Sequence, residues 1–137
     1  MGYFELLQKN IKKRVLQSIH FEITQNCNFQ CAHCFQVKKN HGNCLTLKDI
    51  TNLINDASKL GCLHITFTGG EPFTRPDLFD ILNETRKLTY SFSIMSNASL
   101  ITNKIIKQLK QLNVTNLEIS LLGITEKTYF SVTGIPN

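Results

Sequence analysis

Three cysteines fall within eight residues of this chain, at Cys27, Cys31 and Cys34 in the run CNFQCAHC. Structural zinc sites close the metal with four protein ligands, and iron–sulfur clusters that only transfer electrons are usually held by four thiolates. A close trio with no fourth cysteine at comparable spacing fits instead a cluster in which one iron has no protein ligand. Such an iron is free to bind a substrate or cosubstrate, so the spacing indicates an enzyme.

Two other uses of these cysteines stay open at the level of the residues. A zinc site could recruit Cys44 or His41, because sulfur and nitrogen ligands at short spacing also suit zinc. The sequence has no second CxxC-like pair of the kind that zinc modules usually carry. A disulfide framework needs an oxidising compartment, and the first residues, MGYFELLQKNIKKRVL, show neither an apolar signal core nor a small-residue cleavage site.

The composition sets modest bounds on location and partners. No stretch approaches the length of a membrane span, so we expect a cytoplasmic protein that does not enter a membrane. The net charge is +5, but many lysines fall on the solvent faces of expected helices, as Lys104, Lys107 and Lys110 do. We interpret them as solvated surface and expect no nucleic-acid partner. Cys62 is expected to act as a small apolar residue in a buried strand, and Cys44 has no matched role.

Periodic apolar patterns predict the elements that must position the cysteine loop. The expected strands are 18–24, 63–68, 92–96 and 115–122, and the residues after the last one are expected to form a loop. The expected helices are a weakly amphipathic segment at 3–16, one at 47–60, one that opens near Pro76, and one from Thr102 to Leu112. Thr46 and Thr102 are predicted as N-caps, and Gly61 and Asn113 as stop residues.

The alternation of strands and helices predicts an α/β fold built from parallel βαβ units, as in part of a TIM-like barrel. Two of the strands alternate apolar with polar residues: Leu63, Ile65 and Phe67 against His64, Thr66 and Thr68, and Leu117, Ile119 and Leu121 against Asn116, Glu118 and Ser120. We expect the apolar sets to meet the helices and the polar sets to line an open lumen that holds a polar ligand. A sheet with one face in water would give the same pattern.

The cysteine run, placed directly after a strand with apolar Ile19, Phe21 and Ile23, resembles the signature of the radical S-adenosylmethionine (SAM) enzymes. This resemblance implies that Cys27, Cys31 and Cys34 hold a 4Fe–4S cluster whose open iron binds SAM. It also implies reductive cleavage of SAM to methionine and a 5′-deoxyadenosyl radical, which takes a hydrogen atom from the substrate. The electron would come from a donor such as a flavodoxin or a ferredoxin.

Further positions match the motifs of this family. GGEP, with Gly69, Gly70 and Glu71, resembles the motif that contacts the methionine amino group, largely through backbone atoms; paired glycines also form ordinary tight turns. The remaining matches are Ser96 and Asn97 at the end of the third strand, Ser120 at the end of the fourth, and His33 where an aromatic residue is usual. Asn97 could equally cap the chain reversal. Ala98 stands where many members have Gly.

The last part of the chain resembles one group within the family. The run from Ile119 to Asn137 looks like the fourth strand and following loop of radical enzymes that modify peptides and carry a cysteine-rich domain at their carboxyl end. Tyr129, Val132, Thr133 and Gly134 keep that pattern, whereas Leu122 replaces its aromatic residue. The resemblance therefore favours maturation of a peptide or protein substrate.

The resemblance also implies a domain organisation. Residues 1–17 would be an N-terminal segment, and residues 18–137 the amino-terminal part of a radical SAM core, a partial (β/α)6 barrel truncated before the fifth strand. Six βα units need roughly 180 residues at about 30 each, so the chain would be a fragment of a longer enzyme. The alternatives are an inactive remnant that binds a cluster, or a zinc-binding interaction module.

Overall fold

The computed structural model describes residues 3–36, 45–88 and 90–135. In chain order its elements are α1 (Tyr3–Lys12), β1 (Ser18–Thr24), α2 (Leu47–Lys59), β2 (His64–Gly69), the short 3-10 helix η1 (Pro72–Thr74), α3 (Leu78–Lys87), β3 (Ser91–Ser96), α4 (Asn103–Gln111), β4 (Asn116–Ile119) and α5 (Glu126–Thr133). Cys44 and His41, the two residues that a zinc site could have recruited, lie outside the described ranges.

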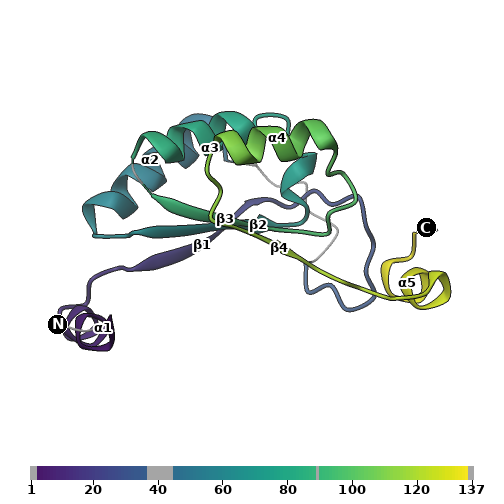
Figure 1. Cartoon of the computed structure of the whole chain (residues 1–137), viewed down its shortest axis with the longest axis horizontal. Helices are drawn as coiled ribbons and strands as arrows, with labels where there is room; N and C mark the ends of the chain where they lie inside the picture. Colours follow the sequence, from purple (N-terminus) through teal and green to yellow (C-terminus); the bar gives the residue numbers. More distant parts are fainter. Residues whose placement is uncertain (1–2, 37–44, 89, 136–137) are drawn as a thin grey trace.

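The four strands form one parallel sheet in the order β1-β2-β3-β4. Helices α2, α3 and α4 lie together over one face of this sheet (Figure 1). Both features confirm the predicted α/β architecture of a partial barrel. Parallel order brings the carboxyl ends of all four strands to the same edge, so the loops that follow them meet there.

Local sequence fixes the ends of the covering helices. Thr46 caps α2 in a capping box with Asp49, and the hydrogen bonds from Thr46 lower the pKa of the Asp49 carboxyl. Thr102 caps α4 through the amide of Ile105, and Asn113 has a φ of 54° directly after α4. These ends confirm the predicted caps. The third helix, predicted to open near Pro76, begins at Leu78, and η1 precedes it at Pro72–Thr74.

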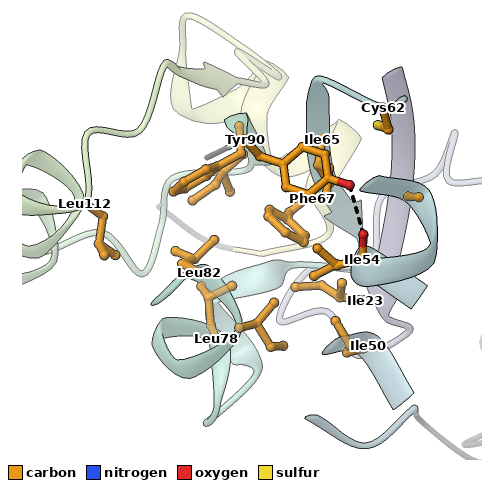
Figure 2. Close-up of a cluster of buried hydrophobic side chains, with 14 of the residues drawn as sticks. Ile23, Ile50, Ile54, Cys62, Ile65, Phe67, Leu78, Leu82, Tyr90 and Leu112 are labelled. Carbon is orange, nitrogen blue, oxygen red and sulfur yellow. Dashed lines mark hydrogen bonds between the residues drawn. The ribbon is translucent and has the colours of Figure 1, made fainter. Parts of the chain in front are cut away.

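The core lies between the sheet and these helices (Figure 2). Phe67 and Phe92, from neighbouring strands, are fully buried and meet edge to face with ring centroids 6.1 Å apart. The buried Tyr90 hydroxyl donates to the carbonyl of Ile54 on α2 at 2.9 Å. Cys62 is buried in the same cluster, as expected, and burial raises the pKa of its thiol.

The other face of the sheet carries polar side chains. Because side chains alternate along a strand, the register places one row of residues on this face across all four strands: His20, Thr66, Ser93 and Asn116. His64 lies between two hydroxyls here, with Nδ1 2.7 Å from Ser91 Oγ and Nε2 3.1 Å from Ser93 Oγ. The polar set therefore faces away from the helices, as predicted.

The apolar set is less completely covered than predicted. Leu63 is 68% exposed because β2 begins only at His64, and Ile119 and Leu121 are 57% and 79% exposed. β4 is an edge strand that ends at Ile119, shorter than the predicted 115–122, and Leu117 is the β4 residue that packs against the core. The prediction that Leu63, Ile119 and Leu121 meet the helices is wrong in this structure.

The two outer helices lie at opposite ends of the molecule (Figure 1). α1 ends at Lys12, earlier than the predicted 3–16. α5 occupies residues that were expected to form a loop; Thr125 and Thr128 form a capping box at its start, and Gly134 ends it with a φ of 69°. Within the described ranges, no helix is both long and apolar enough to cross a membrane.

Candidate functional site

A cavity of about 220 Å³ opens at the carboxyl ends of the strands. It collects residues from the loops after all four strands. The predicted site residues that line it are Cys27, Cys31, His33, Cys34, Gly69, Gly70, Ser96, Asn97 and Ser120. Nine of the ten predicted site residues thus meet around one hollow, although they are spread from position 27 to position 120.

The cysteine loop follows β1 and forms one wall of the cavity. Cys27 and Cys34 are exposed and Cys31 is partly buried, and none of the three is joined in a disulfide to another described cysteine. The amide of Phe29 donates to Cys27 Sγ at 3.4 Å, and Asn97 Nδ2 lies 4.0 Å from the same sulfur. Two donors thus approach a sulfur that lines the cavity.

The donor chemistry fits an iron–sulfur cluster. Three thiols line one cavity beside polar groups that a second ligand could contact. Among the described residues, no group of three or more His, Cys, Asp and Glu side chains is arranged to hold a metal ion. Thiolates are the ligands that iron–sulfur clusters take from proteins.

Gly69 and Gly70 form a second wall, and packing requires both to be glycine. Gly69 has a φ of 128°, and a Cβ there would lie 2.2 Å from the carbonyl oxygen of Thr24. A Cβ on Gly70 would lie 2.2 Å from the carbonyl oxygen of Asn26. The turn therefore runs directly against the backbone that leads from β1 into the cysteine loop, and the Gly70 amide donates to Thr24 at 2.8 Å.

Glu71 lies behind the cavity rather than on its wall. Its side chain is fully buried, and its carboxylate accepts from the Phe73 amide at 3.1 Å, the Ser96 hydroxyl at 2.9 Å and the Asn97 amide at 2.7 Å. Its carboxylate ties the turn after β2 to the end of β3.

Asn97 caps the chain reversal after β3, the alternative that the sequence left open, and it also contacts the cysteine loop. Its Oδ1 accepts from the Ser99 amide at 3.0 Å and from the Ser99 hydroxyl at 2.7 Å, so it caps the chain reversal. Its Nδ2 donates to Asn28 Oδ1 at 3.0 Å, which links the reversal to the cysteine loop. Ala98, the next residue, has a φ of 63°. This left-handed conformation explains physically why glycine suits the position.

Ser120 and His33 complete the predicted set that lines the cavity. Ser120 follows β4, and its amide donates to the carbonyl of Ser96 at 3.0 Å, which holds its side chain beside the end of β3. His33 lies in the cysteine loop and is exposed. Both line the cavity.

Sequence reasoning missed several residues of the cavity wall, namely Phe29, Phe35, Met95 and Leu122. Met95 could have been found from alternation, because it falls on the polar face of β3 close to the carboxyl end. Phe29 and Phe35 carried no such signal, since loop residues have no periodic pattern. Thr68 also lines the cavity and belongs to the polar set expected to face the lumen.

Comparison with known proteins agrees with this geometry. The model of the Radical SAM superfamily matches residues 21–135, and the chain belongs to this superfamily. Over 125 residues it is 29% identical to a GTP 3′,8-cyclase of Clostridium botulinum, a match that covers 88% of this chain and 39% of the relative.

Solved structures share the fold. Streptococcus suis SuiB bound to its precursor peptide SuiA has a TM-score of 0.79 at 23% identity, over 99% of this chain and 33% of that one. The structure of anSMEcpe with bound AdoMet and Kp18Cys peptide has a TM-score of 0.68 at 19% identity, over 85% of this chain and 34% of that one. The chain thus spans between a third and two fifths of the length of these relatives.

Proposed function

We propose that residues 18–137 form the amino-terminal part of a radical SAM core that binds a 4Fe–4S cluster and SAM. The single observation that carries this proposal is the shared cavity. Its wall holds three cysteines, a glycine pair, and the polar ends of β3 and β4 in the positions expected for a cluster and a polar cosubstrate. The superfamily match supports it.

Each part of the wall has a distinct task in this proposal. Cys27, Cys31 and Cys34 hold the cluster, and the Phe29 amide donates to Cys27 Sγ. Gly69 and Gly70 present backbone groups to SAM, and Ser96, Asn97, Ser120 and His33 surround it with polar side chains. When bound, the cluster and SAM supply a 5′-deoxyadenosyl radical for abstraction of a hydrogen atom. The chain's own contribution is to orient these groups and to exclude water from them.

For the substrate, we propose a peptide or a protein. Two structural neighbours are bound to peptides, SuiB to its precursor peptide SuiA and anSMEcpe to a Kp18Cys peptide. The pattern of Tyr129, Val132, Thr133 and Gly134 is also similar to that of peptide-modifying members. A nucleotide substrate is the second candidate, because the chain is 29% identical to a GTP 3′,8-cyclase. The reaction needs one electron, so the proposed partner is a donor such as a flavodoxin or a ferredoxin, and the proposed location is the cytoplasm.

The activity is tested by measuring 5′-deoxyadenosine. The anaerobically reconstituted chain is incubated with SAM and dithionite, and the product is quantified by liquid chromatography beside a Cys31→Ala variant. The proposal predicts 5′-deoxyadenosine from the wild-type chain and none from the variant. A chain that loads a cluster but forms no 5′-deoxyadenosine would be the inactive remnant and would refute the proposed activity. Adding candidate peptides or GTP then separates the two substrate classes, since the substrate is expected to raise the yield.

A further inference from the structure

Helix α5 lies against the cysteine loop, although more than ninety residues separate the two in sequence. Two backbone hydrogen bonds join them: Gln30 N donates to the carbonyl of Thr133 at 3.1 Å, and Ala32 N donates to the carbonyl of Val132 at 2.8 Å. Both amides belong to residues between Cys27 and Cys34. The carboxyl end of α5 therefore fixes the backbone between the cluster ligands.

An aromatic contact supports these bonds. Phe29 is 6% exposed, and its ring meets Tyr129 of α5 edge to face, with centroids 5.9 Å apart and planes at 90°. The amide of Phe29 is the group that donates to Cys27 Sγ. Holding the Phe29 ring thus also holds a donor that acts on a ligand sulfur.

The last carbonyls of α5 are free to accept hydrogen bonds from outside the helix. The last carbonyls of a helix have no partner within the helix, and here the amides of the cysteine loop take that place. Thr133 is fully buried; its hydroxyl donates to the carbonyl of Tyr129 at 2.8 Å and accepts from the Ile135 amide at 3.1 Å. Gly134 adopts a left-handed φ of 69° and turns the chain beside Gln30.

We propose that α5 positions the cluster loop, with Tyr129 as a positioning residue that acts through Phe29. The proposal rests on the proposed function, because it assumes that the loop holds a cluster. α5 would act in two ways. It would keep the loop closed around the cluster, and it would occupy the Gln30 and Ala32 amides, which otherwise could donate to the cluster's sulfur atoms. The carboxyl end of a helix also carries partial negative charge.

Loosening Phe29 would weaken one donor on Cys27 Sγ and so lower the potential, but releasing α5 frees two amides and removes partial negative charge, which together raise it. Hydrogen bonds to the sulfur atoms and exposure to water are among the factors that set the potential of a cluster. Donors directed at the sulfurs stabilise the added electron, as does removal of nearby negative charge. Releasing α5 from the loop should therefore make the cluster easier to reduce. A role confined to stability would leave the potential unchanged.

The test compares the reconstituted wild-type chain with Tyr129→Ala, Tyr129→Phe and Phe130→Ala. Tyr129→Phe keeps the ring, and Phe130 lies on the same helix but is 55% exposed, so Phe130→Ala is the matched control. Two quantities are measured. One is the rate of iron release to a chelator, and the other is the midpoint potential of the cluster, from a redox titration followed by electron paramagnetic resonance. The interaction energy of an edge-to-face aromatic pair corresponds to roughly a 2- to 10-fold change in an equilibrium constant. We expect release from Tyr129→Ala to be faster by about that factor, with a more positive potential.

The outcomes separate the two proposals. A wild-type chain that takes up no cluster would refute the proposed function, and the positioning role with it. If the wild-type chain takes up a cluster, and Tyr129→Ala has the same rate of iron release and the same midpoint potential as the wild type, only the positioning role is refuted. If Tyr129→Ala does not fold, Phe29→Leu tests the same contact from the other side, and it should show the same faster release and more positive potential. A Phe29→Leu variant that matches the wild type would overturn the proposal.

Discussion

Replacing Glu71 by Gln tests how the site is held together. The side chain keeps its size, but one carboxylate oxygen becomes an amide NH2. If that group takes the place of Oε2, it faces the Asn97 amide, which is itself a donor. If it takes the place of Oε1, it faces the Phe73 amide and also loses the bond from Ser96. Either orientation leaves a buried donor without an acceptor.

The magnitude follows from these contacts. A hydrogen bond to a charged group contributes about 1.5–3 kcal/mol, and a buried donor left without a partner costs about 1–3 kcal/mol. A neutral amide is easier to bury than a carboxylate, which offsets part of the loss. We expect the free energy of unfolding to fall by about 2 kcal/mol, which corresponds to roughly 7 °C in Tm for a chain of this size.

Urea unfolding followed by far-ultraviolet circular dichroism measures this change. The matched control is Glu84→Gln, because Glu84 is paired with Lys87 on the surface of α3 at 2.6 Å. Surface pairs of this kind contribute little, so the control should stay within about 0.5 kcal/mol of the wild type. The reasoning is refuted if Glu71→Gln is also within about 0.5 kcal/mol of the wild type.

Three further predictions concern the turn after β3 and the buried ionisable groups. Ala98→Gly should raise the free energy of unfolding by about 0.5 kcal/mol. Glycine removes the strain of an alanine held at a φ of 63°, and this gain slightly exceeds the cost of the larger conformational entropy that glycine gives the unfolded chain. A fall of more than about 1 kcal/mol in the same urea assay would contradict this prediction. In the cluster-free chain, iodoacetamide should modify the exposed Cys27 well before the buried Cys62, whose thiol pKa is raised by burial, and mass spectrometry of peptides would reveal equal rates if the reasoning fails. Burial likewise raises the pKa of Tyr90, so Cys62 and Tyr90 both ionise at lower pH in the unfolded chain than in the folded one. Their contribution to the free energy of unfolding should be complete below pH 9.0, the ordinary thiol value, and should fall as the pH rises through 9.0 and 10.0. A free energy of unfolding that stays constant over this range would contradict the prediction.

Much of the fold was predictable because local signals agreed with the tertiary structure. The strand at 18–24 carried clear alternation, and the helix from Leu47 began with a capping box. Both elements were found where expected. The end of β4 was harder, since Ile119 and Leu121 are apolar yet exposed. Among the described residues, β4 pairs with β3 alone. The alternation of apolar and polar residues in the sequence therefore extends past Ile119, where the hydrogen-bonded strand ends.

The membership of the site was predictable, but the reasons for its residues were not. The order of parallel strands brings Cys27, Gly69, Asn97 and Ser120 to one edge, and motif positions at strand ends are enough to infer this. Which group faces the ligand depends on contacts between loops. Glu71 resembles a ligand-binding residue in sequence, yet its buried position comes from hydrogen bonds to residues twenty-five and twenty-six positions away.

Helix α5 shows the remaining limit. Its eight residues carry little amphipathic pattern, with Phe130 exposed and Tyr129 packed against a distant loop. A capping box of Thr125 and Thr128 marks its start, but such a box was not expected in a segment interpreted as a loop. Its contacts with Gln30 and Ala32 involve backbone groups, and backbone pairing between distant segments leaves no mark in the side chains of a single sequence.

The central claim is that Cys27, Cys31 and Cys34 hold a cluster with an iron open to SAM. The most direct measurement is electron paramagnetic resonance of the chain after anaerobic reconstitution with iron and sulfide and reduction, with and without SAM, beside Cys34→Ala. Our account predicts a reduced-cluster signal that SAM perturbs and that the variant lacks. A chain that forms no cluster and instead retains stoichiometric zinc through these cysteines would contradict it.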